Sequence, residues 1–128
     1  MAAQSTHQWS LARDLYQECL AAIEQGRPLD VVIVGSWNVN PGYRLVDRPG
    51  EPASYPGIAA DFERTFAVLK RLPCDVFLGA HGAYFDMLKK IERMAARGSS
   101  VWIDPQGYQA AVLERERAFQ AELSRQSR

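Results

Sequence analysis

Two short apolar runs, separated by enough residues for a helix, constrain the fold of this chain more than any other feature. The first run, Val31-Val-Ile-Val34, consists of β-branched residues. β-branched side chains favour strands, and a run without polar residues is typical of a parallel strand buried on both faces. The second run, Val76-Phe-Leu78, is too short for a helix and follows Pro73. We therefore expect strands at 30–35 and 75–78.

The segment between the two runs predicts a long loop followed by a helix. Residues 36–56 contain four prolines, so no regular element fits there, and loops of about 20 residues are often functional. The next residues repeat apolar side chains at spacings of four, four and three, which indicates an amphipathic helix at 57–71 (Ile58, Phe62, Phe66 and Leu69). Strand, helix and strand then form a βαβ unit with parallel strands, whose carboxyl ends face the same edge.

Helical spacing of apolar residues indicates three further helices, at 9–25, at 86–96 and from Pro105 onward. Asp104 and Pro105 are typical of the N-cap and the first position of a helix. We expect residues 124–128 to fray. The predicted fold class is therefore α/β, with a βαβ unit of few parallel strands and flanking helices.

The composition narrows the class of partner. The 128 residues predict one compact unit, and 15 basic residues balance 15 acidic ones. We therefore expect neither nucleic acid nor a membrane surface as a partner. No apolar run approaches the roughly 20 residues that span a bilayer, and the first residues do not resemble a signal peptide. As written, the chain is expected to be cytoplasmic.

Polar side chains follow both predicted strands at the edge where ligands usually bind in α/β sheets. Ser36 and Asn38 follow the first strand, and His81 follows the second. The βαβ topology brings Ser36 and Asn38 toward His81. One histidine alone is weak evidence for a site, because function requires a constellation of groups. The sequence after the first strand contains no glycine pattern typical of a nucleotide site.

Three segments together resemble a known enzyme family. They are Asp30-Val-Val-Ile-Val-Gly-Ser-Trp-Asn-Val-Asn-Pro-Gly-Tyr-Arg-Leu45, Tyr55-Pro56 with Ile58 through Leu72, and Pro73-Cys-Asp-Val-Phe-Leu-Gly-Ala-His-Gly82. Their order and spacing resemble the carboxyl-terminal part of the zinc-dependent metallo-β-lactamases, in the third subclass of class B. The resemblance separates a family-like region, 27–128, from an amphipathic helix at 1–26 without a counterpart in the family.

The resemblance implies a fold, a reaction and roles for four residues. Family members are αββα sandwiches that hold two zinc ions, and zinc-bound hydroxide opens the β-lactam amide. His81 matches a ligand of the second zinc. Ser36 and Asn38 match positions that hydrogen-bond the carboxylate of the β-lactam, and Tyr43 matches a tyrosine near the β-lactam carbonyl. Family members are periplasmic or secreted.

The chain departs from the family in its metal ligands and in one cysteine. The family carries a His-x-His-x-Asp-His motif and a further histidine, whereas this sequence has only His7 and His81. Catalytic zinc sites need about three protein ligands. We therefore expect a truncated relative that does not hold zinc tightly and is inactive as an isolated chain. Cys74 matches a cysteine that is often disulfide-bonded, but Val101-Trp-Ile103 contains no partner cysteine.

Two other hypotheses remain open at this point. The chain is either a small non-catalytic α/β interaction module, with the amino-terminal helix over the bare part of the sheet, or a remnant that self-associates through an exposed apolar face. Alternatively, a separate chain supplies the missing ligands. The resemblance alone leaves open whether the chain is an enzyme.

Overall fold

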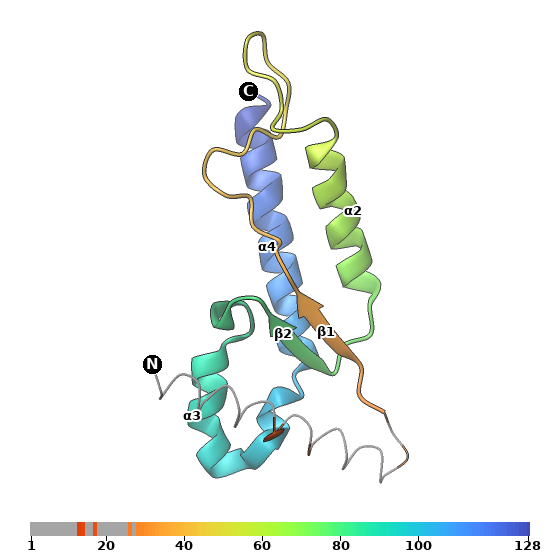
Figure 1. Cartoon of the computed structure of the whole chain (residues 1–128), viewed down its shortest axis with the longest axis vertical. Coiled ribbons are helices and arrows are strands. Elements are labelled where there is room, and N and C mark those ends of the chain that lie inside the picture. The colour runs from red at the N-terminus through yellow and green to blue at the C-terminus, as the bar shows by residue number, and fades with distance from the viewer. Residues whose placement is uncertain (1–12, 15–16, 18–25, 27) are drawn as a thin grey trace.

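The computed structural model describes residues 13, 14, 17, 26 and 28–128. The helix expected at 9–25 and the separate region 1–26 lie almost entirely outside these residues, so both stay predictions. The described residues form two strands, three α-helices and two 3-10 helices (Figure 1). Their bounds are β1 (Val31–Val34), α2 (Ile58–Arg71), β2 (Val76–Gly79), η1 (Gly82–Phe85), α3 (Met87–Arg97), η2 (Gly98–Trp102) and α4 (Pro105–Gln126).

The two strands form a parallel sheet with α2 as the crossover, so the predicted βαβ unit and α/β fold class are confirmed. The register pairs Val31 with Val76 and Val34 with Gly79. The backbone N–H of Ala80 donates to the carbonyl oxygen of Val34 at 2.9 Å, which extends the pairing past the strand ends. The first residues of the two loops therefore leave the sheet next to each other.

The prediction that β1 is buried on both faces is wrong. Val32 and Val34 are 9% and 5% exposed, but Val31 is 42% exposed and Ile33 is 70% exposed. Val32 and Val34 belong to the core that includes residues of α2 and α4, whereas Val31 and Ile33 point to the more exposed face. The continuous β-branched run correctly predicted a strand. It did not predict that one face of the strand is exposed, because the described sheet has only two strands.

The core lies between the sheet and the helices α2 and α4, which run side by side in Figure 1. The Phe62 ring stacks on Phe119 with centroids 5.3 Å apart, and the Tyr108 ring meets Phe77 of β2 edge-on at 5.3 Å. The Tyr108 hydroxyl donates to the carbonyl oxygen of Leu69 at 2.5 Å. Aromatic contacts therefore join α2 to α4, and α4 to the sheet.

The ends of α2 follow from local sequence. The helix begins after Gly57, whose φ of 85° is a left-handed conformation that glycine adopts without steric cost. It ends at Arg71, two residues before Pro73, and its last turn carries Lys70 and Arg71, which interact favourably with the helix dipole. These bounds confirm the helix predicted at 57–71.

The start of α4 confirms the predicted cap. The Asp104 carboxylate accepts a hydrogen bond from the backbone N–H of Gly107 at 2.9 Å, and Pro105 is the first helical residue. The second carboxylate oxygen of Asp104 lies 3.1 Å from the ammonium nitrogen of Lys90, which is only 3% exposed. This ion pair joins α3 to the start of α4.

The prediction of a fraying end is wrong for residues 124–126. The helix α4 continues to Gln126, because the Gln126 side chain bonds to the backbone of the loop that follows β1. That loop, 36–56, has no helix or strand and contains one isolated bridge between Arg48 and Glu51. Among the described residues, no helix is long and apolar enough to cross a membrane.

Candidate functional site

Ser36 and His81 both follow the carboxyl ends of the paired strands, at the same edge of the sheet. The last pair of the register is Val34 with Gly79, and Ser36 and His81 each lie two residues beyond it. Both side chains are exposed. The structure therefore brings a hydroxyl group and an imidazole to one edge of the sheet, as the topology predicts.

Tyr84 connects Asn38 with His81. The side-chain amide of Asn38 donates to the Tyr84 hydroxyl at 3.3 Å, and the His81 ring meets the Tyr84 ring edge-on with centroids 5.1 Å apart. The Tyr84 ring also packs against Trp37 at 5.4 Å. Sequence reasoning did not identify Tyr84. Its buried ring holds the loop after β1 against the turn that follows His81.

A glycine at the end of β2 makes room for this tyrosine. A Cβ atom at Gly79 would lie 2.7 Å from the Cδ2 atom of Tyr84, closer than real Cβ atoms approach another carbon. A side chain at position 79 would therefore displace the ring that contacts Asn38 and His81. The only trace of this approach in the sequence is the glycine itself, which does not name its partner, so sequence reasoning had no signal for Tyr84.

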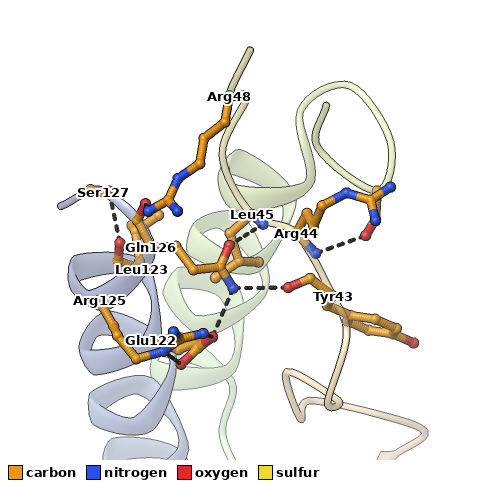
Figure 2. A network of polar contacts seen from close by, with 10 residues as sticks. Tyr43, Arg44, Leu45, Arg48, Glu122, Leu123, Arg125, Gln126 and Ser127 are labelled. Carbon is orange, nitrogen blue, oxygen red and sulfur yellow. Dashed lines mark hydrogen bonds and ion pairs between the residues drawn. The ribbon is translucent and has the colours of Figure 1, made fainter. Parts of the chain in front are cut away.

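Tyr43 follows Ser36 and Asn38 in the same loop, and its hydrogen bonds are to Asn40 and Gln126. Its hydroxyl accepts a hydrogen bond from the Asn40 amide at 3.2 Å, and its carbonyl oxygen accepts one from the Gln126 amide at 2.8 Å. Figure 2 shows the carbonyl turned toward Gln126 and the phenol ring turned away. Among the described residues, no hydrogen bond or ring contact joins Tyr43 to Ser36 or His81. Its predicted place beside a β-lactam carbonyl stays a prediction.

Gln126 fastens this loop to the end of α4. Its side-chain oxygen accepts from the backbone N–H of Leu45 at 2.7 Å, while its side-chain nitrogen donates to Tyr43 and to Glu122, both at 2.8 Å. Its own carbonyl oxygen accepts from the Arg48 guanidinium. One side chain therefore satisfies two backbone groups of the loop (Figure 2).

Glu122 supports this contact in its ionised form. Hydrogen bonds from Arg125 and Gln126 lower the pKa of the Glu122 carboxyl from 4.5 to about 2. The Arg125 guanidinium contacts both carboxylate oxygens, at 2.6 and 2.8 Å. The acceptor for the Gln126 amide is therefore ionised at every pH above its lowered pKa.

A cavity of about 500 Å³ lies between the start of the loop and α4, lined in part by Asn38, Glu122 and Arg115. The Arg115 guanidinium lies 6.0 Å from the centre of the Trp37 ring, within cation–π range. The Trp37 indole N–H is buried and has no acceptor among the described residues. An unsatisfied buried donor costs about 1–3 kcal/mol. The cavity therefore places charged groups of both signs beside the loop that carries Asn38.

The described residues do not fit a zinc site by themselves. They contain no group of three or more histidine, cysteine, aspartate or glutamate side chains that could hold a metal ion. His81 is the one histidine in the described part of the chain. Tyr84, whose ring contacts His81, and Asn38, which bonds to Tyr84, are poor zinc ligands.

Cys74 does not add a reactive group to the site. It is a free, half-buried thiol, and burial raises its pKa from 9.0 to about 11. Thiolates are the nucleophilic and metal-binding form of cysteine, so the raised pKa disfavours the reactive form of this side chain at neutral pH.

The sheet, its crossover helix and the helices around it match part of the metallo-β-lactamase fold. No family model matches the chain. The similarity comes from solved structures, which agree in fold and, over the matched residues, in part of the sequence.

The native FEZ-1 metallo-β-lactamase from Legionella gormanii is 35% identical with a TM-score of 0.71, over 80% of this chain and 37% of that chain. A Cronobacter sakazakii metallo-β-lactamase is 28% identical with a TM-score of 0.68, over 78% of this chain and 38% of that chain. MEM-A1, a subclass B3 metallo-β-lactamase from a soil metagenome library, is 25% identical with a TM-score of 0.63, over 76% of this chain and 36% of that chain. The chain thus spans less than two fifths of the length of these enzymes.

Proposed function

We propose that this chain is the carboxyl-terminal part of a β-lactam hydrolase of subclass B3. In this proposal Ser36 and Asn38 bind the carboxylate of the substrate, Tyr43 lies beside the β-lactam carbonyl, and His81 occupies a position that ligates zinc. The isolated chain of 128 residues is inactive, because it lacks the other metal ligands.

The juxtaposition of Ser36, Asn38 and His81 at one edge of the sheet is the observation that supports this proposal. Carboxylates accept hydrogen bonds from hydroxyl and amide groups. Asn38 donates one amide hydrogen to Tyr84, so the other remains for a ligand, and the exposed Ser36 hydroxyl can donate as well. The similar enzyme SMB-1 was solved with mercaptoacetic acid, which is itself a small carboxylate.

The number of available ligands supports the proposed inactivity. The whole sequence has two histidines, and the described residues contain no metal-binding group. A catalytic zinc site needs about three protein ligands and an open position. In this proposal, the described residues contribute one ligand, His81, and do not complete a zinc site by themselves.

A turnover assay tests the proposed inactivity. The purified chain, with zinc added, is mixed with a chromogenic cephalosporin, and hydrolysis is followed by absorbance. We expect no turnover above the rate in buffer. Sustained turnover that is abolished both by a chelator and by His81→Ala would show that the isolated chain builds a complete site.

A binding experiment tests the substrate side separately. In NMR spectra of the isolated chain, benzylpenicillin should shift the backbone amide signals of residues 36–38, and Asn38→Ala should weaken these shifts. Ser124→Ala, which changes an exposed serine of α4, is the matched control and should leave them unchanged. Equal shifts in Asn38→Ala and the parent chain would contradict the assignment of Asn38 to the substrate side.

A further inference from the structure

The cavity between α4 and the loop that follows β1 extends the candidate substrate side toward the helix. Its volume of about 500 Å³ lies in the range of about 300–1,000 Å³ that is usual for ligand sites. Asn38 lines the cavity from the loop, and Arg115 lines it from α4. Figure 1 shows this loop running along α4 after it leaves β1. A molecule held by Asn38 can therefore extend within the same cavity toward Arg115.

Arg115 is the cation of this cavity, and no described residue neutralises it. Its guanidinium lies 6.0 Å from the centre of the Trp37 ring, and no hydrogen bond or ion pair joins it to another described residue. The carboxylate of Glu116, the next residue of α4, pairs with Lys70 at 2.8 Å instead. A guanidinium over an aromatic ring keeps the N–H groups at its edge free, and these groups match the two oxygens of a carboxylate.

Trp37 fixes the place at which Arg115 can meet a ligand. The indole side chain is 1% exposed, and its ring contacts Phe77 at 5.5 Å and Tyr84 at 5.4 Å between centroids. Because these rings hold the indole, the guanidinium over it has less freedom to lose on binding than an arginine that extends into water. The arginine is therefore partly preorganised for an anion.

The other charged residue that lines the cavity, Glu122, is compensated within the chain. The Arg125 guanidinium contacts both of its carboxylate oxygens, at 2.6 and 2.8 Å, and the Gln126 amide donates to one of them at 2.8 Å. These donors reduce the repulsion that Glu122 would exert on an anion in the cavity. The uncompensated charge among the residues that line this cavity is therefore the positive charge of Arg115.

We infer that Arg115 selects β-lactams that carry a second carboxylate, on the substituent of the lactam ring, while Asn38 binds the carboxylate of the fused ring. This inference rests on the proposed function, which assigns Asn38 to the substrate side, and it names the substrate class as dianionic β-lactams. The second carboxylate gains charge-assisted hydrogen bonds from the guanidinium. A substituent without charge meets no matching partner at Arg115.

The test compares benzylpenicillin with carbenicillin, which differs from it by one carboxylate on the side chain, in NMR titrations of the whole 128-residue chain. We expect carbenicillin to bind about fivefold more tightly, which is the upper end of what a partly exposed ion pair contributes. Arg115→Gln should remove this preference and leave the affinity for benzylpenicillin unchanged. Arg117→Gln, which removes the same charge from an exposed position of α4, is the matched control and should keep the preference.

Ionic strength and the arginine signal give readouts that do not depend on a variant. Salt screens an ion pair that is partly exposed, so the preference for carbenicillin should fall as sodium chloride is added. Carbenicillin should also shift the side-chain Nε–H signal of Arg115, whereas benzylpenicillin should not. A preference that is independent of salt, or an Arg115 signal that responds equally to both penicillins, would overturn the inference.

The same titrations separate this inference from the proposed function. Equal affinities for the two penicillins, or equal loss of the preference in Arg115→Gln and Arg117→Gln, would overturn the inference, and so would weaker binding of both penicillins in Arg115→Gln. The proposed function would still hold if Asn38→Ala weakened the binding of benzylpenicillin. A preference that Arg115→Gln removes, with both affinities unchanged in Asn38→Ala, would support the arginine site and contradict the proposed role of Asn38. Absence of binding by both penicillins would contradict both proposals.

Discussion

Gln126 shows how one side chain at a helix end can determine the path of a functional loop. Its amide accepts from Leu45 and donates to Tyr43, at 2.7 and 2.8 Å. Without it, two backbone groups of the loop would have to find water. No periodicity or motif in the sequence marks this glutamine, because its partners lie about 80 residues earlier in the chain.

Replacing Gln126 should release the loop without unfolding the chain. For Gln126→Ala we expect faster amide exchange at Leu45 and a loss of about 1–2 kcal/mol in the free energy of unfolding, since each hydrogen bond contributes about 1 kcal/mol. Gln120→Ala, at an exposed position of the same helix, is the control and should change neither. Unchanged exchange at Leu45 in Gln126→Ala would show that the loop is held by other contacts.

The lowered pKa of Glu122 predicts a pH dependence for the same contact. Because the pKa falls from 4.5 to about 2 in the folded chain, the stabilisation by ionised Glu122 is complete above pH 4.5 and is lost as the pH falls toward 2. Amide exchange rates at Leu45, corrected for intrinsic rates, should show increasing opening of the loop over this interval. In Glu122→Gln this added opening should disappear, and if it persists another group is responsible.

At the scale of elements, Lys90 and Asp104 join α3 to α4. Lys90 is buried, and its ammonium group lies 3.1 Å from the Asp104 carboxylate and 5.9 Å from the centre of the Phe85 ring. Asp104 also caps α4. Removal of Asp104 therefore leaves a buried ammonium group without its partner, whereas removal of Lys90 leaves a carboxylate that still caps α4.

Asp104→Ala should be more destabilising than Lys90→Met. Loss of Asp104 removes a cap worth about 1 kcal/mol and leaves a buried ammonium unpaired, which costs about 3 kcal/mol more. Lys90→Met replaces that group with an apolar chain of similar length, and Asp104 remains partly hydrated and still caps the helix. Denaturant unfolding of both variants measures the difference, and an equal or reversed order would contradict this account of the pair.

The helices and strands were predictable from local sequence patterns, whereas the burial of their faces and their tertiary contacts were not. Apolar spacing predicted α2, and the pair of Asp104 and Pro105 predicted the start of α4. The exposure of Ile33 was not predictable, because a β-branched run has the same composition whether one face or two faces are covered. The strand-end residues of the site followed from topology, but Tyr84 did not, since its role depends on the close approach at Gly79.

At the scale of the whole molecule, the chain combines a folded core with a candidate site in which the described residues form no metal-binding group. Aromatic side chains of α2, α4 and β2 pack together in the core. The edge that carries Ser36 and His81, however, offers one histidine in the described part of the chain. The matched enzymes are more than twice as long as the matched part. The partial coverage and the small number of metal ligands are the observations on which the proposed function rests.

The zinc content of the isolated chain tests this account most directly. The purified chain is incubated with excess zinc, passed through a desalting column in buffer that contains a weak chelator, and analysed for metal. Because a single histidine cannot hold the ion, we predict far less than one zinc per chain, both in the parent and in His81→Ala. One or more equivalents of zinc retained by the parent and lost in His81→Ala would contradict the account, because the chain would then complete a metal site alone.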